Sequence, residues 1–106
     1  MPVTAITSHE QFSEIINSGD PAVIDFWATW CGPCRMISPI FEQLSNDPEL
    51  SGIQFYKVDV DTQDQISQEV GIRAMPTFAA FKNGGKIDEA IGADGAKLVN
   101  LIHALK

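Results

Sequence analysis

The stretch from residue 22 to residue 34 reads Ala22-Val-Ile-Asp-Phe-Trp-Ala-Thr-Trp-Cys-Gly-Pro-Cys34. Its first seven residues form a near-continuous apolar run, which predicts a strand over Ala22–Ala28 that is buried on both faces, as in a parallel sheet. A helix is predicted to follow over Cys31–Asn46, with a kink at Pro39 because proline lacks a backbone N–H. Two cysteines therefore lie where a buried strand turns into a helix.

Strands and helices alternate outward from this junction. Before it, Ser8 is a candidate N-cap of a helix, Gln11 completes a capping box, and Gly19 suits the left-handed residue that ends a helix. The spacing of apolar residues and turn residues gives the other elements. Strands are predicted over Val3–Ile6, Ile53–Val60, Thr77–Lys82 and Lys86–Ile91, and helices over Asp64–Val70 and after Asp94. Within the helix at 31–46, the predicted apolar stripe is Ile37, Ile40, Phe41 and Leu44.

The resulting order, β-α-β-α-β-α-β-β-α, predicts an α/β fold. Alternation in the first half indicates parallel strands joined by right-handed helical crossovers. Asn83-Gly84-Gly85 between the last two strands is typical of a hairpin, which adds antiparallel strands. We expect three α/β/α layers with a central mixed sheet, in one domain over residues 1–106, since a chain of this length forms a single core.

Composition excludes several classes of function. The 106 residues are 44% apolar and carry a net charge of −7, and an acidic domain repels phosphate backbones, so no nucleic-acid partner is expected. No apolar run approaches the roughly 18 residues of a membrane span. Met1-Pro2-Val3-Thr4 lacks the cationic and apolar segments of a secretory signal. We expect no membrane contact and a cytoplasmic location, with entry into the nucleus open to so small a domain.

The cysteine pair is the main functional feature. Two cysteines are too few for a secreted disulfide scaffold, and in a reducing compartment such a pair indicates metal binding or catalysis. A zinc site needs two more ligands. His9 and His103 do not lie at metal-ligand spacing from each other or from the cysteines, so we expect no metal. A structural disulfide between Cys31 and Cys34 would remove little entropy from the unfolded chain. Redox chemistry is therefore favoured over both alternatives.

The start of the helix should make the two thiols differ in reactivity. Free N–H groups and the positive end of the helix dipole favour a thiolate at Cys31, which should lower its pKa. Pro33 fits the first turn because its missing N–H would have no partner there. The geometry of the first turn can bring the sulfur of Cys34 within disulfide distance of the sulfur of Cys31. We expect Cys31 to be the exposed nucleophile and Cys34 to be the shielded resolving thiol.

Two charged residues of the predicted strands are candidates for proton chemistry. Asp25 lies in the middle of the apolar run, where burial would raise its pKa and make it a candidate proton acceptor. The residues alone equally allow Asp25 to point to solvent. Lys57 could neighbour Asp25 or extend to solvent. Three aspartates at 59, 61 and 64 resemble part of a calcium loop, but Asp64 stands where glycine is required, so a solvated acidic turn is favoured.

The chain resembles the thioredoxin family along nearly its whole length. The matching segments are Asp25–Ala28, Trp30–Ile37, Pro39, Lys57–Asp59, Met75–Phe78, Lys82–Gly84 and Gly92-Ala93. The runs Ala28-Thr29-Trp30 and Ala74-Met75-Pro76 look like the eukaryotic cytosolic, fungal type. The resemblance implies the thioredoxin fold, in agreement with the order of elements.

The resemblance also implies a shallow apolar groove around Cys31. It implies a cis bond before Pro76 and a substrate strand that pairs with the backbone of Met75. The implied substrate-binding residues are Trp30, Met75, Pro76, Gly92 and Ala93. The implied supporting residues are Gly32, Pro33, Lys57 and Pro76, with Asp25 below Cys34. Without the resemblance, core packing would explain Trp30 and Met75 equally well, and a simple turn would explain Gly92.

The implied activity is that of a general protein-disulfide reductase, an electron carrier in cell redox homeostasis. Cys31 would attack a substrate disulfide, and Cys34, after losing a proton to Asp25 directly or through a water, would release the reduced substrate. The chain would bind no cofactor, since NADPH acts only through thioredoxin reductase. Further implied partners are peroxiredoxin, ribonucleotide reductase and methionine sulfoxide reductase, and a monomer is expected.

Two alternatives stay open. A protein-disulfide isomerase or oxidase would use the same fold, although those groups usually carry histidine between the cysteines, where this chain has Gly32-Pro33. A binding subunit would use the groove without turnover. An intact pair of thiols makes a purely structural role a weaker explanation.

Overall fold

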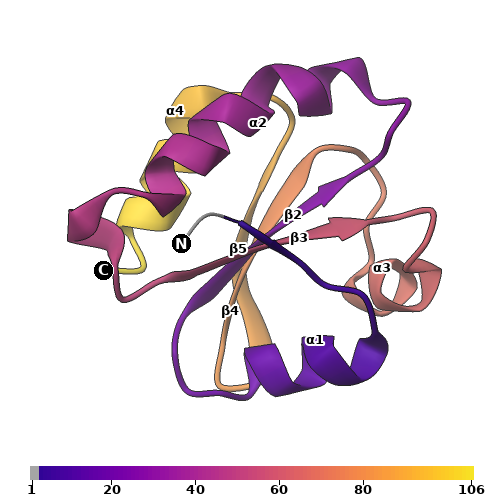
Figure 1. Cartoon of the computed structure of the whole chain (residues 1–106), viewed down its shortest axis with the longest axis horizontal. Helices are drawn as coiled ribbons and strands as arrows, with labels where there is room; N and C mark the ends of the chain where they lie inside the picture. Colours follow the sequence, from indigo (N-terminus) through magenta and orange to yellow (C-terminus); the bar gives the residue numbers. More distant parts are fainter. Residues whose placement is uncertain (1–2) are drawn as a thin grey trace.

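The computed structural model describes residues 3–106 (Figure 1). Met1 and Pro2, which the sequence prediction includes in the domain, lie outside the described residues. The elements are β1 (Thr4–Ala5), α1 (His9–Ile16), β2 (Ala22–Trp27), α2 (Gly32–Ser45), β3 (Gln54–Asp59), α3 (Asp64–Val70), β4 (Thr77–Lys82), β5 (Gly85–Ile91) and α4 (Gly95–His103). The predicted order is confirmed, with one additional 3₁₀ turn over Pro48–Leu50. Within residues 3–106, no helix combines the length and apolar composition that crossing a bilayer requires.

A mixed five-stranded sheet forms the middle layer, in the order β1-β3-β2-β4-β5. Strands β1, β3 and β2 are parallel to one another. Strand β4 pairs antiparallel with β2, and β5 pairs antiparallel with β4. In Figure 1, α2 and α4 lie on one face of the sheet, and α1 and α3 lie on the other. The predicted three-layer α/β/α architecture is therefore confirmed.

Strand β2 supplies apolar side chains to both layers, because successive residues of a strand point to opposite faces. Val23 packs with α2 and α4, whereas Ile24 and Phe26 pack with α1 and α3. All three side chains are fully buried. Asp25 shares the face of Val23, so the fold directs this carboxyl group toward α2.

Caps and turns set most of the boundaries. Ser8 accepts the N–H of Gln11 as predicted, but the Gln11 side chain accepts from the N–H of Thr7 rather than from Ser8. Helix α1 ends at Ile16, three residues before Gly19, which is left-handed but lies beyond the helix. The predicted position of Gly19 as the end of the helix is therefore wrong.

Two further details differ from the sequence prediction. Asn83 and Gly84 both have positive φ, so the β4–β5 loop has two residues and Gly85 already belongs to β5. This geometry matches the right-handed twist of the strands. Ile40, predicted in the core, is 38% exposed. The Ile40 side chain packs over Gly95, and because glycine has no side chain, Ile40 stays partly open to solvent.

Candidate active site

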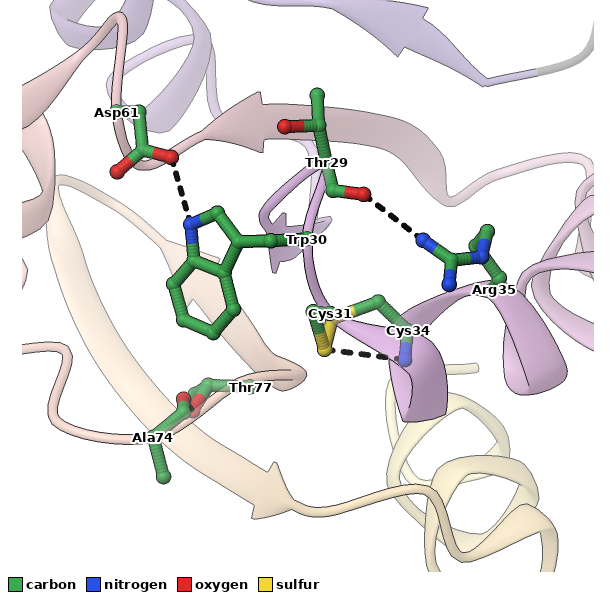
Figure 2. Close-up of a disulfide and its surroundings, with 8 residues drawn as sticks. All are labelled: Thr29, Trp30, Cys31, Cys34, Arg35, Asp61, Ala74 and Thr77. Carbon is green, nitrogen blue, oxygen red and sulfur yellow. Dashed lines mark hydrogen bonds between the residues drawn. A yellow bond between two sulfur atoms is a disulfide. The ribbon is translucent and has the colours of Figure 1, made fainter.

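A disulfide between Cys31 and Cys34 lies where β2 turns into α2 (Figure 2). The two Cα atoms are 5.3 Å apart, within the ordinary range for a disulfide. Cys31 is the N-cap of α2, and its Sγ accepts the backbone N–H of Cys34 at 3.2 Å. This helix N–H would also stabilise a thiolate at Cys31 after reduction.

The expected exposure of Cys31 is wrong in this oxidised state. Cys31 is 4% exposed and Cys34 is 3% exposed. Both sulfurs form a small apolar cluster with Ala28, against which Trp27 and Met75 pack. Position therefore distinguishes the two cysteines: Cys31 precedes the helix, whereas Cys34 lies in its first turn.

Trp30 stands beside the disulfide with its indole ring in solvent. It is 64% exposed, so core packing does not explain it. Its Nε1–H donates to Asp61 Oδ2 at 2.9 Å (Figure 2), and the backbone N–H of Asp61 donates to Asp59 Oδ1. The acidic turn thus holds the indole ring. Residues 3–106 contain no group of three or more histidine, cysteine or acidic side chains arranged to hold a metal ion.

Strand pairing brings the other predicted groove residues to the same end of the sheet as the disulfide. Thr77 at the start of β4 pairs with Phe26 near the end of β2, and Ile91 at the end of β5 pairs with Thr77. The segments next to these positions carry Met75, Pro76, Gly92 and Ala93. These segments therefore lie at the end of the sheet that carries the disulfide.

The Met75–Pro76 bond is cis, as the resemblance implies. The carbonyl oxygen of Pro76 accepts the N–H of Gly92 at 2.9 Å, which joins the two loops. Met75 and Gly92 are half-buried, Pro76 is buried, and Ala93 is exposed. On α2, Gly32 is half-buried and Pro33 is exposed.

Asp25 is buried, which settles the choice that the sequence left open. It is 5% exposed, and its Oδ1 atom has no hydrogen-bond partner among residues 3–106. Burial raises the pKa of Asp25 to about 7, Lys57 opposes this rise, and Glu42 adds to it. A cavity of about 130 Å³ is lined by Asp25, Trp27, Cys34, Arg35, Ser38 and Lys57. Asp25 thus shares a cavity with Cys34 and can exchange a proton near neutral pH.

Lys57 is the neighbour of Asp25 in the parallel pairing of β2 and β3. Its Nζ lies 5.8 Å from the centroid of the Trp27 ring, a cation–π distance. The ammonium group is therefore held over Trp27 and acts on the Asp25 carboxyl group through space.

Sequence reasoning missed three residues that line this cavity. Arg35 donates from Nη1 to the carbonyl oxygen of Thr29 at 2.8 Å, which ties the preceding loop to α2 (Figure 2). Trp27 lies two residues after Asp25, and Ser38 lies four residues after Cys34. The strand and helix periods could have found both, because these spacings place side chains on one face.

A reactive sulfur pair held at a helix start, beside a buried acid, defines a dithiol–disulfide oxidoreductase. The description "Thioredoxin" belongs to the family model that matches residues 3–104. The chain belongs to the thioredoxin family, and its activity is that of a protein-disulfide reductase.

The similar proteins include fungal thioredoxins. The thioredoxin of Malassezia sympodialis is 59% identical over 96 residues, which cover 91% of each chain. Its solved structure has a TM-score of 0.95, at 56% identity over 99% of this chain and 94% of that chain. The thioredoxin of Coprinus comatus is 53% identical over 94% of each chain. A structure from a study of thiol resolution in yeast mitochondrial 1-Cys peroxiredoxin has a TM-score of 0.90, at 38% identity over 97% of this chain and 95% of that chain. The predicted fungal type is confirmed.

Proposed function

We propose that Cys31 is the nucleophile and Cys34 the resolving thiol of a general protein-disulfide reductase. The position of Cys31 as N-cap of α2 is the observation that carries this assignment. In the first step, the Cys31 thiolate attacks one sulfur of a substrate disulfide. That disulfide breaks, a mixed disulfide forms, and the departing substrate thiolate takes up a proton.

Asp25 serves the second step. Cys34 gives its proton to the Asp25 carboxylate, and the new thiolate attacks the Sγ of Cys31. The mixed disulfide breaks, and the second substrate sulfur leaves as a thiolate that takes up a proton. Two electrons have then passed to the substrate, and the Cys31–Cys34 disulfide remains. The shared cavity and the raised pKa of Asp25 support this role.

The groove beside the disulfide holds the substrate. Exposed Trp30 and half-buried Met75 offer apolar surface, while the backbone of Met75 pairs with an extended substrate segment. Pro76, Gly92 and Ala93 complete the groove. Gly32, Pro33 and Lys57 support the reactive pair, the first two by shaping the start of α2 and Lys57 through its charge.

The partner that restores the dithiol is thioredoxin reductase, which supplies electrons from NADPH, so this chain needs no bound cofactor. The family membership supports this proposal. The peroxiredoxin named with the yeast structure supports peroxiredoxins as one class of substrate. Ribonucleotide reductase and methionine sulfoxide reductase are proposed by family resemblance.

We further propose that residues 1–106 act as one monomeric domain in the cytoplasm, with access to the nucleus. The sequence holds no third cysteine for a second disulfide. Imaging of a fluorescent fusion and sedimentation of the purified protein test location and oligomeric state.

Trapping of the mixed disulfide tests the roles of the two cysteines. Cys34→Ser should accumulate covalent adducts with oxidised protein substrates, because the resolving thiol is missing. Non-reducing electrophoresis with mass spectrometry would locate the adduct on Cys31. The matched Cys31→Ser variant should form far fewer adducts, since it lacks the nucleophile. Adducts that form equally well on Cys34 in that control would reverse the assignment.

A further inference from the structure

The cavity between β2 and α2 holds polar atoms whose hydrogen bonds are unaccounted for. Asp25 Oδ1 and Trp27 Nε1 are buried and have no partner within the part of the chain described here. The two side chains lie on the α2 face of β2, because they are two residues apart. A buried donor or acceptor left without a partner is unfavourable. The cavity of about 130 Å³ has the volume to hold a water molecule, and both side chains line it and offer such a water a partner.

Ser38 adds a hydroxyl group to the wall of the same cavity. It lies one helical turn after Cys34, on the same face of α2. Helical serines commonly return their hydroxyl to a carbonyl in the preceding turn, as Ser45 does to the oxygen of Glu42 at 2.6 Å. Within residues 3–106, the Ser38 hydroxyl has no such bond, so it remains available to the cavity. A hydroxyl group both donates and accepts, which suits it to fix the orientation of a water.

We propose that Ser38 is a positioning residue for the proton transfer from Cys34 to Asp25, because its hydroxyl orients a water between the two groups. The inference rests on the proposed role of Asp25. The Cys34 thiol gives its proton to the water, and the water passes one of its own protons to the Asp25 carboxylate. The Cys34 thiolate then attacks Cys31 Sγ, and the substrate thiolate leaves. Ser38 loses and gains no proton overall.

The charged groups around Asp25 do not replace this function. Lys57 approaches from β3, and Arg35 and Glu42 are on α2, while the partner of Asp25 on β4 is the uncharged Phe78. Ser38 is neutral, so its replacement by alanine leaves these charges in place. The replacement therefore tests hydration and orientation separately from electrostatics.

Rapid mixing of the reduced protein with an oxidised protein substrate resolves the two steps. Ser38→Ala should slow the release of the reduced substrate about tenfold, a modest part of what general acid–base catalysis contributes. Formation of the mixed disulfide should keep its rate. The pH midpoint of the release step should rise, because Asp25 loses solvation of its charged form.

Two further variants separate positioning from folding. Ser38→Thr keeps a hydroxyl group and should restore most of the release rate. Ser45→Ala removes a hydroxyl from the same helix outside the cavity, so both steps should keep the rates of the unaltered protein.

The inference is overturned if Ser38→Ala releases substrate at the original rate with the original pH midpoint. Equal slowing of both steps at an unchanged pH midpoint would also overturn it, since that is the signature of a distorted helix. Asp25→Asn in the same experiment distinguishes the two proposals. If it slows release while Ser38→Ala does not, only the role of Ser38 fails. If neither variant affects release, the role of Asp25 fails as well.

Discussion

At the scale of single residues, the site reverses the usual positions of acidic and aromatic side chains. The Asp25 carboxyl group is 5% exposed, whereas the Trp30 indole is 64% exposed. Burial of an unpaired acid and exposure of a large apolar ring both oppose stability. Each has a chemical use here, since Asp25 can take a proton near neutral pH and Trp30 offers an apolar surface beside the disulfide.

The hydrogen bond between Trp30 and Asp61 leads to a prediction about substrate binding. Asp61→Ala should free the indole ring and raise the KM for a protein disulfide about fivefold, the effect of one hydrogen bond worth about 1 kcal/mol. The kcat should change little, because Asp61 does not contact the sulfur atoms. Steady-state assays with a protein substrate check this. Asp61→Asn retains an acceptor oxygen, and a KM as high as that of the alanine variant would contradict the explanation.

At the scale of elements, periodicity and turn residues predicted the fold well. Helix α3 and strand β4 have their predicted bounds, because Gly71 and the apolar run at 78–81 mark them clearly. The predictions for the end of α1 and for the burial of Ile40 were wrong. Both depend on what lies opposite in space, such as Gly95 beneath Ile40, and no local pattern contains that information.

The candidate site was predictable from the sequence only in part. The cysteine pair and the unusual acid in an apolar strand are visible in the sequence itself. The family resemblance supplied the cis bond at Pro76, which turn residues alone would not indicate. The cavity itself was not foreseen, because its lining residues come from β2, α2 and β3, and only the packing of these elements brings them together. The burial of Cys31 also follows from packing rather than from its position in the chain.

The turn between β4 and β5 leads to a prediction about stability. Gly84 has φ +87°, and a Cβ atom there would come within 2.5 Å of Asn17 Oδ1. Gly84→Ala should lower the free energy of unfolding by about 1–2 kcal/mol from backbone strain alone, and by more if Asn17 cannot move. Urea denaturation measures the change. Gly85→Ala is the matched control, since within residues 3–106 nothing beyond its chain neighbours lies within 4 Å of its Cβ position. An equal loss in that variant would refute the role of the turn.

At the scale of the whole molecule, the fold has to meet two requirements at once. The sheet must be covered by helices on both faces, and α2 must also leave a cavity against β2 that is lined in part by polar side chains. The radius of gyration of 12.3 Å is that of a compact chain of this length. The cavity therefore represents a local loss of packing between β2 and α2. Its energetic consequence should appear in the stability of the entire molecule.

The raised pKa of Asp25 makes global stability depend on pH. Its pKa is about 7 in the folded protein, against 3.8 for the ordinary side chain. Between these values the folded state holds a proton that the unfolded state has lost, so stability falls as pH rises from about 4 to 7. The full shift corresponds to on the order of 4 kcal/mol.

Removal of this charge should therefore stabilise the protein at neutral and higher pH. We expect Asp25→Asn to raise the free energy of unfolding by about 2–4 kcal/mol at pH 8, and by little at pH 4, where Asp25 is already neutral in the folded state. Urea unfolding of the oxidised protein at both pH values measures this difference, with the disulfide intact in both forms. Subtraction of the unaltered protein at each pH cancels the titration of the other acids. A gain of equal size at pH 4 and pH 8 would show that packing, and not the buried charge, accounts for the change.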